Sequence, residues 1–180
     1  SGQALMIFNQ FEELGNYLWH YQVTGHAMEE ALKAVMRPGD TYRGVTLTTG
    51  SAGTIACGDY LKQIFPTSKI GASEALQCPT LLNNGYGAHR IEGIGDKHVP
   101  WIHNIKNTDL VMAIDDSAVV AIARLFNETA GRSYLLRKGV PENVVDRLDL
   151  LGFSGIANVL SAIKFAKYYE LGENDIVLTV

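Results

Sequence analysis

Residues 45–73 contain the arrangement that most constrains how this chain folds: two apolar runs separated by a helical segment. Residues 45–48 and 69–73 have the short apolar pattern of buried strands, and residues 54–64 have the pattern of a helix that ends before Pro66. Strands joined through a helix lie parallel, because an antiparallel pair needs only a short turn between its members. We therefore predict an α/β fold with a mostly parallel sheet flanked by helices.

The rest of the chain continues this alternation. Thr24 is a candidate N-cap for a helix that stops before Pro38-Gly39, and Asp115 or Asp116 is a candidate cap for a later helix. We interpret residues 1–23 as an irregular entry segment or a short helix, and residues 24–180 as one α/β domain. The other predicted elements are helices at 24–35, 116–129, 141–149 and 155–169, strands at 110–114 and 175–180, and an ordered loop at 83–100.

The composition argues against a nucleic-acid surface and against a membrane span. The 180 residues are 47% hydrophobic and carry a net charge of −4, with scattered rather than clustered Lys and Arg. No apolar run reaches the roughly 18 residues of a membrane span, and no signal peptide is visible. The two cysteines form no C-x-x-C pair and the histidines lack ligand spacing, which predicts no metal site and a reducing, cytoplasmic setting.

The loop at residues 49–54 is the first candidate site. Small and hydroxyl-bearing residues follow a predicted strand and lead into a helix, whose first turn leaves backbone N–H groups unpaired. Such a loop can hold a phosphate through its main chain without a lysine. It is neither a P-loop nor a G-x-G-x-x-G fingerprint, and a simple tight turn between strand and helix is the alternative interpretation.

Two further segments carry candidate chemistry. Three glycines in 87–95 mark places where a side chain would obstruct the backbone or a ligand. His89 and Arg90 lie in that segment, and we expect them mainly to support the loop by hydrogen bonds. Ser154 lies where the N-cap of the 155–169 helix belongs, and it could instead donate to a ring nitrogen of a ligand at the sheet edge.

Together these segments resemble the cysteine synthase-like, fold-type-II pyridoxal-phosphate enzymes, which include cystathionine β-synthase and share a tryptophan synthase β-like fold. The similar motifs run in the family's order along nearly the whole chain. They are Asn9-Gln10-Phe11-Glu12 (N-Q-F-E), Thr24-Gly25 (T-G), Gly50-Ser51-Ala52-Gly53-Thr54-Ile55 (G-T-G-G-T-I), Gly87-Ala88-His89-Arg90-Ile91-Glu92-Gly93-Ile94-Gly95 (G-P-H-K-I-Q-G-I-G) and Gly152-Phe153-Ser154-Gly155 (from G-I-S-S-G).

The resemblance implies a cofactor, a set of site residues and a reaction. The cofactor is pyridoxal 5′-phosphate, and the reaction is loss or replacement of the β-substituent of a serine- or cysteine-like amino acid. It also implies a homodimer. The implied cofactor-binding residues are Gly50, Ser51, Ala52, Gly53 and Thr54 for the phosphate and Ser154 for the pyridine nitrogen, with Gly93 beside the substrate.

Two departures from the family bear on activity. The family's Schiff-base lysine, in an S-x-K-x-R setting, belongs to a region that would precede residue 1, and no lysine here has that context. We therefore expect this chain to be a catalytically silent piece of a longer protein, with no catalytic residue of its own and a missing N-terminal region as its partner. Residues 131–150 also look longer than the usual connection and are a candidate insertion that caps the site or joins subunits.

Other functions stay open at this stage. Within the same fold, a threonine synthase- or diaminopropionate lyase-like enzyme is an alternative. From a different class, the chain could be a non-catalytic module that binds a phosphate ligand or regulates a partner. A Rossmann-type nucleotide binder is disfavoured, because G-x-G-x-x-G is absent.

Overall fold

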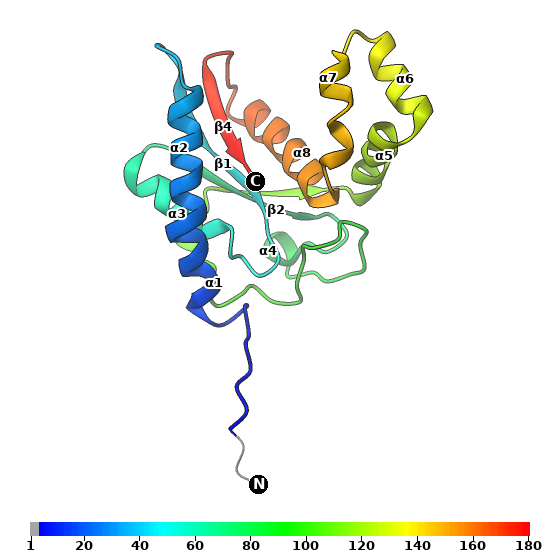
Figure 1. Ribbon diagram of the computed structural model, residues 1–180. Helices are drawn as coiled ribbons and strands as arrows, with labels where there is room; N and C mark the ends of the chain where they lie inside the picture. The colour runs from blue at the N-terminus through cyan, green and yellow to red at the C-terminus, as the bar shows by residue number, and fades with distance from the viewer. Residues whose placement is uncertain (1–3) are drawn as a thin grey trace.

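The computed structural model describes residues 4–180 and contains a parallel sheet of four strands (Figure 1). The strands are β1 (Thr41–Thr48), β2 (Lys69–Ala75), β3 (Leu110–Ile114) and β4 (Asp175–Thr179), in the spatial order β3-β2-β1-β4. Every pairing in the sheet is parallel, and β1 lies between β2 and β4. The predicted α/β class and parallel sheet are confirmed.

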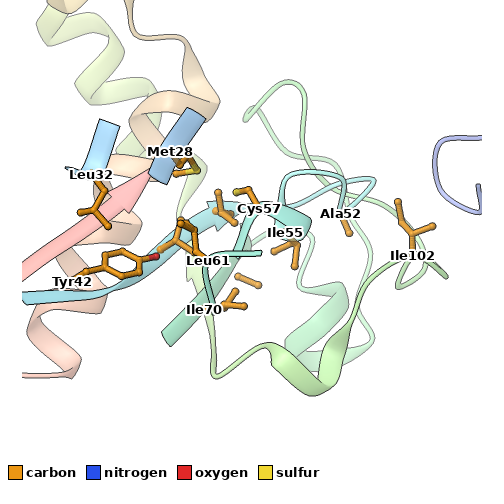
Figure 2. Close-up of a cluster of buried hydrophobic side chains, with 12 residues drawn as sticks. Met28, Leu32, Tyr42, Ala52, Ile55, Cys57, Leu61, Ile70 and Ile102 are labelled. Carbon is orange, nitrogen blue, oxygen red and sulfur yellow. The ribbon is translucent and has the colours of Figure 1, made fainter. Parts of the chain in front are cut away.

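Different helices cover the two faces of the sheet. On one face, α2 (Gly25–Val35) and α3 (Ile55–Ile64) pack over β1 and β2 through a buried apolar cluster, of which Figure 2 labels Met28, Leu32, Tyr42, Ala52, Ile55, Cys57, Leu61, Ile70 and Ile102. On the other face lies α8 (Phe153–Tyr168), whose Phe165 is fully buried. A Cβ at Gly44 or Gly71 would come within 2.9 or 3.1 Å of the Phe165 ring, so these glycines let α8 approach the sheet.

The N-terminal helix begins earlier than predicted. Helix α1 (Leu14–Trp19) continues through a π-helical turn, η1 (His20–Thr24), directly into α2. Thr24 has helical backbone angles and makes no capping bond, so the predicted N-cap at Thr24 is wrong. The reason is tertiary: the Tyr17 hydroxyl donates to buried Asp59 of α3 over 2.7 Å, and the Tyr21 ring packs edge-on against Tyr60.

The helix after β3 starts as predicted. Asp115 is its N-cap and accepts a hydrogen bond from the Ser117 amide over 2.9 Å, and α5 spans Asp116–Asn127. Between β2 and β3 lie a short α4 (Thr80–Asn83), an irregular loop and a single 3-10 turn, η2 (Ile105–Asn107). The ordered loop predicted near 83–100 is therefore present.

The segment before α8 is more helical than predicted. It contains α6 (Thr129–Arg137), which the sequence analysis missed, then α7 (Glu142–Val145) and the 3-10 turn η3 (Leu148–Leu150). Arg132 of α6 links this helix to the end of α7: it donates to the Val145 carbonyl and pairs with Asp146 at 2.5 Å. Figure 1 shows that α6 and α7 project away from the sheet.

Helix α8 begins two residues earlier than predicted, at Phe153 instead of Gly155. Its N-cap is Gly152, with extended backbone angles, while Ser154 already lies within the first turn. The prediction that Ser154 is the N-cap is therefore wrong. The Ser154 hydroxyl is free for another partner.

No single helix within residues 4–180 is both long and apolar enough to cross a bilayer. The segments Glu142–Leu150 and Phe153–Tyr168 together have a sufficient length and composition, but they meet at a bend of 119°.

Candidate functional site

A cavity of about 430 Å³ opens at the carboxyl ends of β1 and β4. In parallel α/β sheets, this edge is where ligands bind. The lining includes every site residue predicted from the sequence, drawn from three separate parts of the chain: Gly50, Ser51, Ala52, Gly53, Thr54, Gly93 and Ser154. The fold therefore brings the predicted residues together around one space.

The loop from Gly50 to Thr54 presents unpaired backbone donors. Just before it, the Thr48 amide donates to Asn158 Oδ1 over 2.7 Å and the Thr49 amide to the Ser73 carbonyl over 2.9 Å. Within residues 4–180, by contrast, no amide from Gly50 to Thr54 donates to a protein acceptor. Had these amides been bonded to neighbouring carbonyls, the loop could not hold an oxyanion.

Packing around the loop fixes its shape. Ala52 is in the left-handed region, with φ of 63°, where L side chains are rare. A Cβ at Gly53 would lie 2.5 Å from the side-chain amide of Asn16, and a Cβ at Gly50 would lie 3.2 Å from the Gly95 amide nitrogen. The loop is thus held between α1 and the 93–95 segment, and a side chain at Gly53 would displace the Asn16 amide while one at Gly50 would press on the Gly95 backbone.

The opposite wall is the start of α8. Ser154 lines the cavity, and its hydroxyl has no protein hydrogen-bond partner among the described residues. One turn later, Asn158 bridges the ends of two strands, because its Nδ2 donates to the Val180 carbonyl over 2.8 Å while its Oδ1 accepts from Thr48. Ser154 can therefore donate to a ligand, whereas Asn158 is committed to holding the sheet edge.

The cavity is almost without ionisable side chains. Of the side chains from the described part of the chain that line it, His20 alone is ionisable. Its Nδ1 lies 2.9 Å from Thr24 Oγ1, and burial lowers the pKa of this imidazole below its ordinary value. Recognition of an anion here would rest on backbone dipoles and hydroxyls rather than on a lysine or arginine.

Known proteins resemble this chain. No family model matches it. A cysteine synthase from Staphylococcus aureus is 26% identical over 172 residues, which cover 95% of this chain and 48% of that protein. Among solved structures, a hydrogen sulfide-producing enzyme from Fusobacterium nucleatum matches at a TM-score of 0.73 and 26% identity, over 95% of this chain and 45% of that one. A cysteine synthase from Entamoeba histolytica has the same fold, with a TM-score of 0.70, 23% identity and coverage of 95% and 44%.

The chain is cysteine synthase-like. It has the type II fold of pyridoxal-phosphate enzymes, and it spans about half the length of the curated relatives it matches. The resemblance inferred from the motifs is therefore confirmed. The residues present also fit the phosphate of that cofactor, since unpaired amides from Gly50 to Thr54 are the donors that a phosphate accepts from.

In this cysteine synthase-like chain, Arg90 supports the 87–95 loop by hydrogen bonds, as predicted. The same prediction for His89 is wrong, because its buried Nδ1 has no partner among the described residues. Arg90 donates to Asp116 from its backbone amide, at 2.9 Å, and from its guanidinium, at 2.8 Å. His89 lies against Gly95, where a Cβ would come within 2.5 Å of its Nε2. Neither side chain lines the cavity, whereas Gly93 and Ile94 do.

Sequence reasoning missed two residues that shape the site, Asn16 and His20. Both lie in the segment interpreted as an irregular entry or a short helix, and they are four residues apart on the helix that begins at Leu14. Their spacing is the signal that could have found them, because residues i and i+4 share one helical face. The apolar residues of this segment do not recur with a helical period, so the sequence pattern did not predict the helix from Leu14.

Proposed function

We propose that this chain is the cofactor-phosphate-holding part of a pyridoxal-phosphate-dependent enzyme acting on a serine- or cysteine-like amino acid. The reaction is β-elimination or β-replacement. The observation that carries the proposal is the set of unpaired amides from Gly50 to Thr54, in residues that line the same cavity as Ser154. The relatives named as cysteine synthases and as a hydrogen sulfide-producing enzyme support a sulfur-containing leaving group or nucleophile.

Each part of the cavity has a role in this proposal. The loop amides and the Ser51 hydroxyl hold the phosphate at the start of α3, and the Thr54 hydroxyl joins them by leaving its long, 3.5 Å bond to the Thr48 carbonyl. The Ser154 hydroxyl donates to the pyridine nitrogen, and a neutral donor leaves that nitrogen without a full positive charge. When bound, the cofactor supplies the electron sink for breaking a bond at the β-carbon of the amino acid.

Gly93 supplies space for the substrate. It has φ of 88°, and a Cβ built on it would meet no atom within 4 Å, so the backbone borders open space. No lysine side chain from residues 4–180 lines the cavity. We therefore propose that this chain binds the phosphate but needs a lysine from elsewhere for catalysis, in a homodimeric cytoplasmic enzyme.

Binding of pyridoxine 5′-phosphate tests the proposal. This compound lacks the aldehyde that reacts with surface lysines, so calorimetry measures binding without Schiff-base formation. We expect it to bind the chain, and we expect pyridoxine, without the phosphate, to bind at least about tenfold more weakly, since charge-assisted hydrogen bonds each contribute about 1.5–3 kcal/mol.

Two variants locate the binding. Gly53→Val places a side chain where Asn16 lies and should abolish the preference for the phosphorylated compound. Gly172→Ala is the matched control, because its Cβ would meet nothing closer than 3.9 Å and the residue is remote from the cavity. Equal affinity for pyridoxine and its phosphate in the unmodified chain would contradict the proposal. Separately, borohydride trapping with pyridoxal phosphate should label no single lysine preferentially.

A further inference from the structure

The cavity contains a feature that phosphate binding by main-chain amides does not require: an imidazole. Asn16 and His20 lie one helical turn apart, so both face the loop that follows β1. Asn16 Nδ2 donates to Ser51 Oγ over 3.2 Å, which brings this helix face into direct contact with the loop. His20, one turn further, lines the cavity itself.

The His20 ring is held at one nitrogen and open at the other. Nδ1 is within hydrogen-bond distance of Thr24 Oγ1, at 2.9 Å. Among the described residues, Nε2 has no protein partner. The π-helical turn from His20 to Thr24 makes this bond within one turn of the helix, and π-helical turns are frequent at functional sites.

Two carboxylates on the elements around the ring accept hydrogen bonds from residues other than His20. The elements packed against the π-helical turn are α1, α2 and α3. Asp59 of α3 accepts from the Tyr17 hydroxyl at 2.7 Å and from Asn107 at 2.8 Å.

On α2, Glu29 accepts from the Tyr60 hydroxyl at 2.6 Å and pairs with Lys33 at 2.5 Å. His26 stacks on the Tyr60 ring, with centroids 4.2 Å apart. Burial is the one cause that shifts the pKa of His20, so Asp59, Glu29 and the exposed Glu30 of α2 do not raise the pKa of this imidazole.

We propose that His20 is an ionisable ligand of the anion held by residues 50–54, so that binding of a dianion brings a proton onto its imidazole. The inference rests on the proposed function, because it needs an anion at the loop. Without the anion the ring is neutral near pH 7, since burial disfavours its charged form. A dianion in the same cavity favours the imidazolium, whose Nε2–H donates toward the bound oxygens.

Thermodynamic reciprocity predicts how much the anion affinity changes when His20 is protonated. If the anion raises the pKa of His20, then protonated His20 strengthens anion binding by the same factor. A rise of about 0.5 to 1 pKa unit corresponds to about 3- to 10-fold tighter binding, since one unit is a tenfold change. Affinity should therefore increase as the pH falls from about 8 to about 5.5, across the range in which histidine titrates.

Sulfate is the probe, because it stays a dianion throughout this range. The imidazole resonances of histidine-labelled chain are followed by NMR against pH, with and without saturating sulfate. We expect sulfate to raise the pKa of one of the five histidines, and this resonance should be missing in His20→Gln. Calorimetry on the same samples should show sulfate affinity that depends on pH in the unmodified chain and not in His20→Gln.

His26→Asn is the matched control, because His26 lies on the adjoining helix but does not line the cavity. It should keep the full pH dependence. Sulfate that binds the loop, as shown by its loss in Gly53→Val, without changing the pKa of His20 overturns this inference alone. Failure of sulfate to bind at any pH, or binding that Gly53→Val leaves intact, contradicts the proposed function instead. The wild-type titration requires no variant to fold.

Discussion

The side-chain amide of Asn16 lies against the loop from Gly50 to Thr54, with Nδ2 3.2 Å from Ser51 Oγ. The same amide occupies the space that a Cβ at Gly53 would fill. Asn16 thus contacts two residues of a loop that follows it by more than thirty positions in the sequence, and it holds in place amides that have no protein acceptor.

Replacing this contact should weaken ligand binding more than stability. Asn16→Leu keeps the side-chain size but removes the hydrogen bond to Ser51, a loss of about 0.5–1.5 kcal/mol, or about 2- to 10-fold in affinity for pyridoxine 5′-phosphate. Calorimetry measures the affinity. Asn127→Leu, which removes an exposed side-chain bond to the Ala123 carbonyl, should leave the affinity unchanged. Equal affinities in all three proteins would show that Asn16 does not position the loop.

The left-handed backbone at Ala52 predicts a strong dependence on side-chain shape. Ala52→Val places a β-branched residue at φ of 63° in a buried position, and the free energy of unfolding should fall by about 2 kcal/mol. Urea denaturation measures this change. The same substitution at exposed Ala118 in α5 should cost only about 0.5 kcal/mol, through helix propensity. A loss at residue 52 no larger than at residue 118 would argue against backbone strain there.

Acid should weaken the Arg90–Asp116 ion pair that supports the 87–95 loop. The hydrogen bond from the Arg90 guanidinium is the main reason that the pKa of Asp116 lies below its ordinary value. Because the folded-state pKa is the lower one, this stabilisation is present above the unfolded pKa of about 4 and is lost as the pH falls through the folded pKa. In Asp116→Asn the urea midpoint should therefore depend less on pH between about 5 and about 3 than in the unmodified chain.

Asp149→Asn, at an exposed position without a hydrogen-bond partner among the described residues, is the comparison. Its pH dependence should match that of the unmodified chain. If Asp116→Asn matches it too, the Arg90–Asp116 pair contributes nothing to acid sensitivity.

Both cysteines should resist modification in the folded chain. Cys57 and Cys78 are buried, and burial raises the pKa of the Cys57 thiol to about 12. Because the thiolate is the nucleophile, Ellman's reagent at about pH 8 should react with neither residue until urea unfolds the chain. Rapid release of one equivalent without denaturant would show that a thiol is accessible in the native state.

Local patterns in the sequence determined the sheet and the loop chemistry. The apolar runs at 45–48 and 69–73 with a helix between them require a parallel pair, because of how far the chain must travel between the strands. Glycines and hydroxyl residues at 50–54 indicated unpaired amides, and Asp115 indicated a cap, because these effects depend on residues close in sequence.

The tertiary structure alone decided where the N-terminal helix begins and what it contributes. Residues 14–24 have little helical periodicity, yet Tyr17 bonded to Asp59 and Asn16 against Gly53 hold them in a helix that completes the cavity. Likewise, α6 forms although Gly131 disfavours it, with Arg132 bonded to the Val145 carbonyl and Asp146 of the neighbouring segment. Contacts between residues distant in sequence outweighed weak local preferences, and no local pattern encodes such contacts.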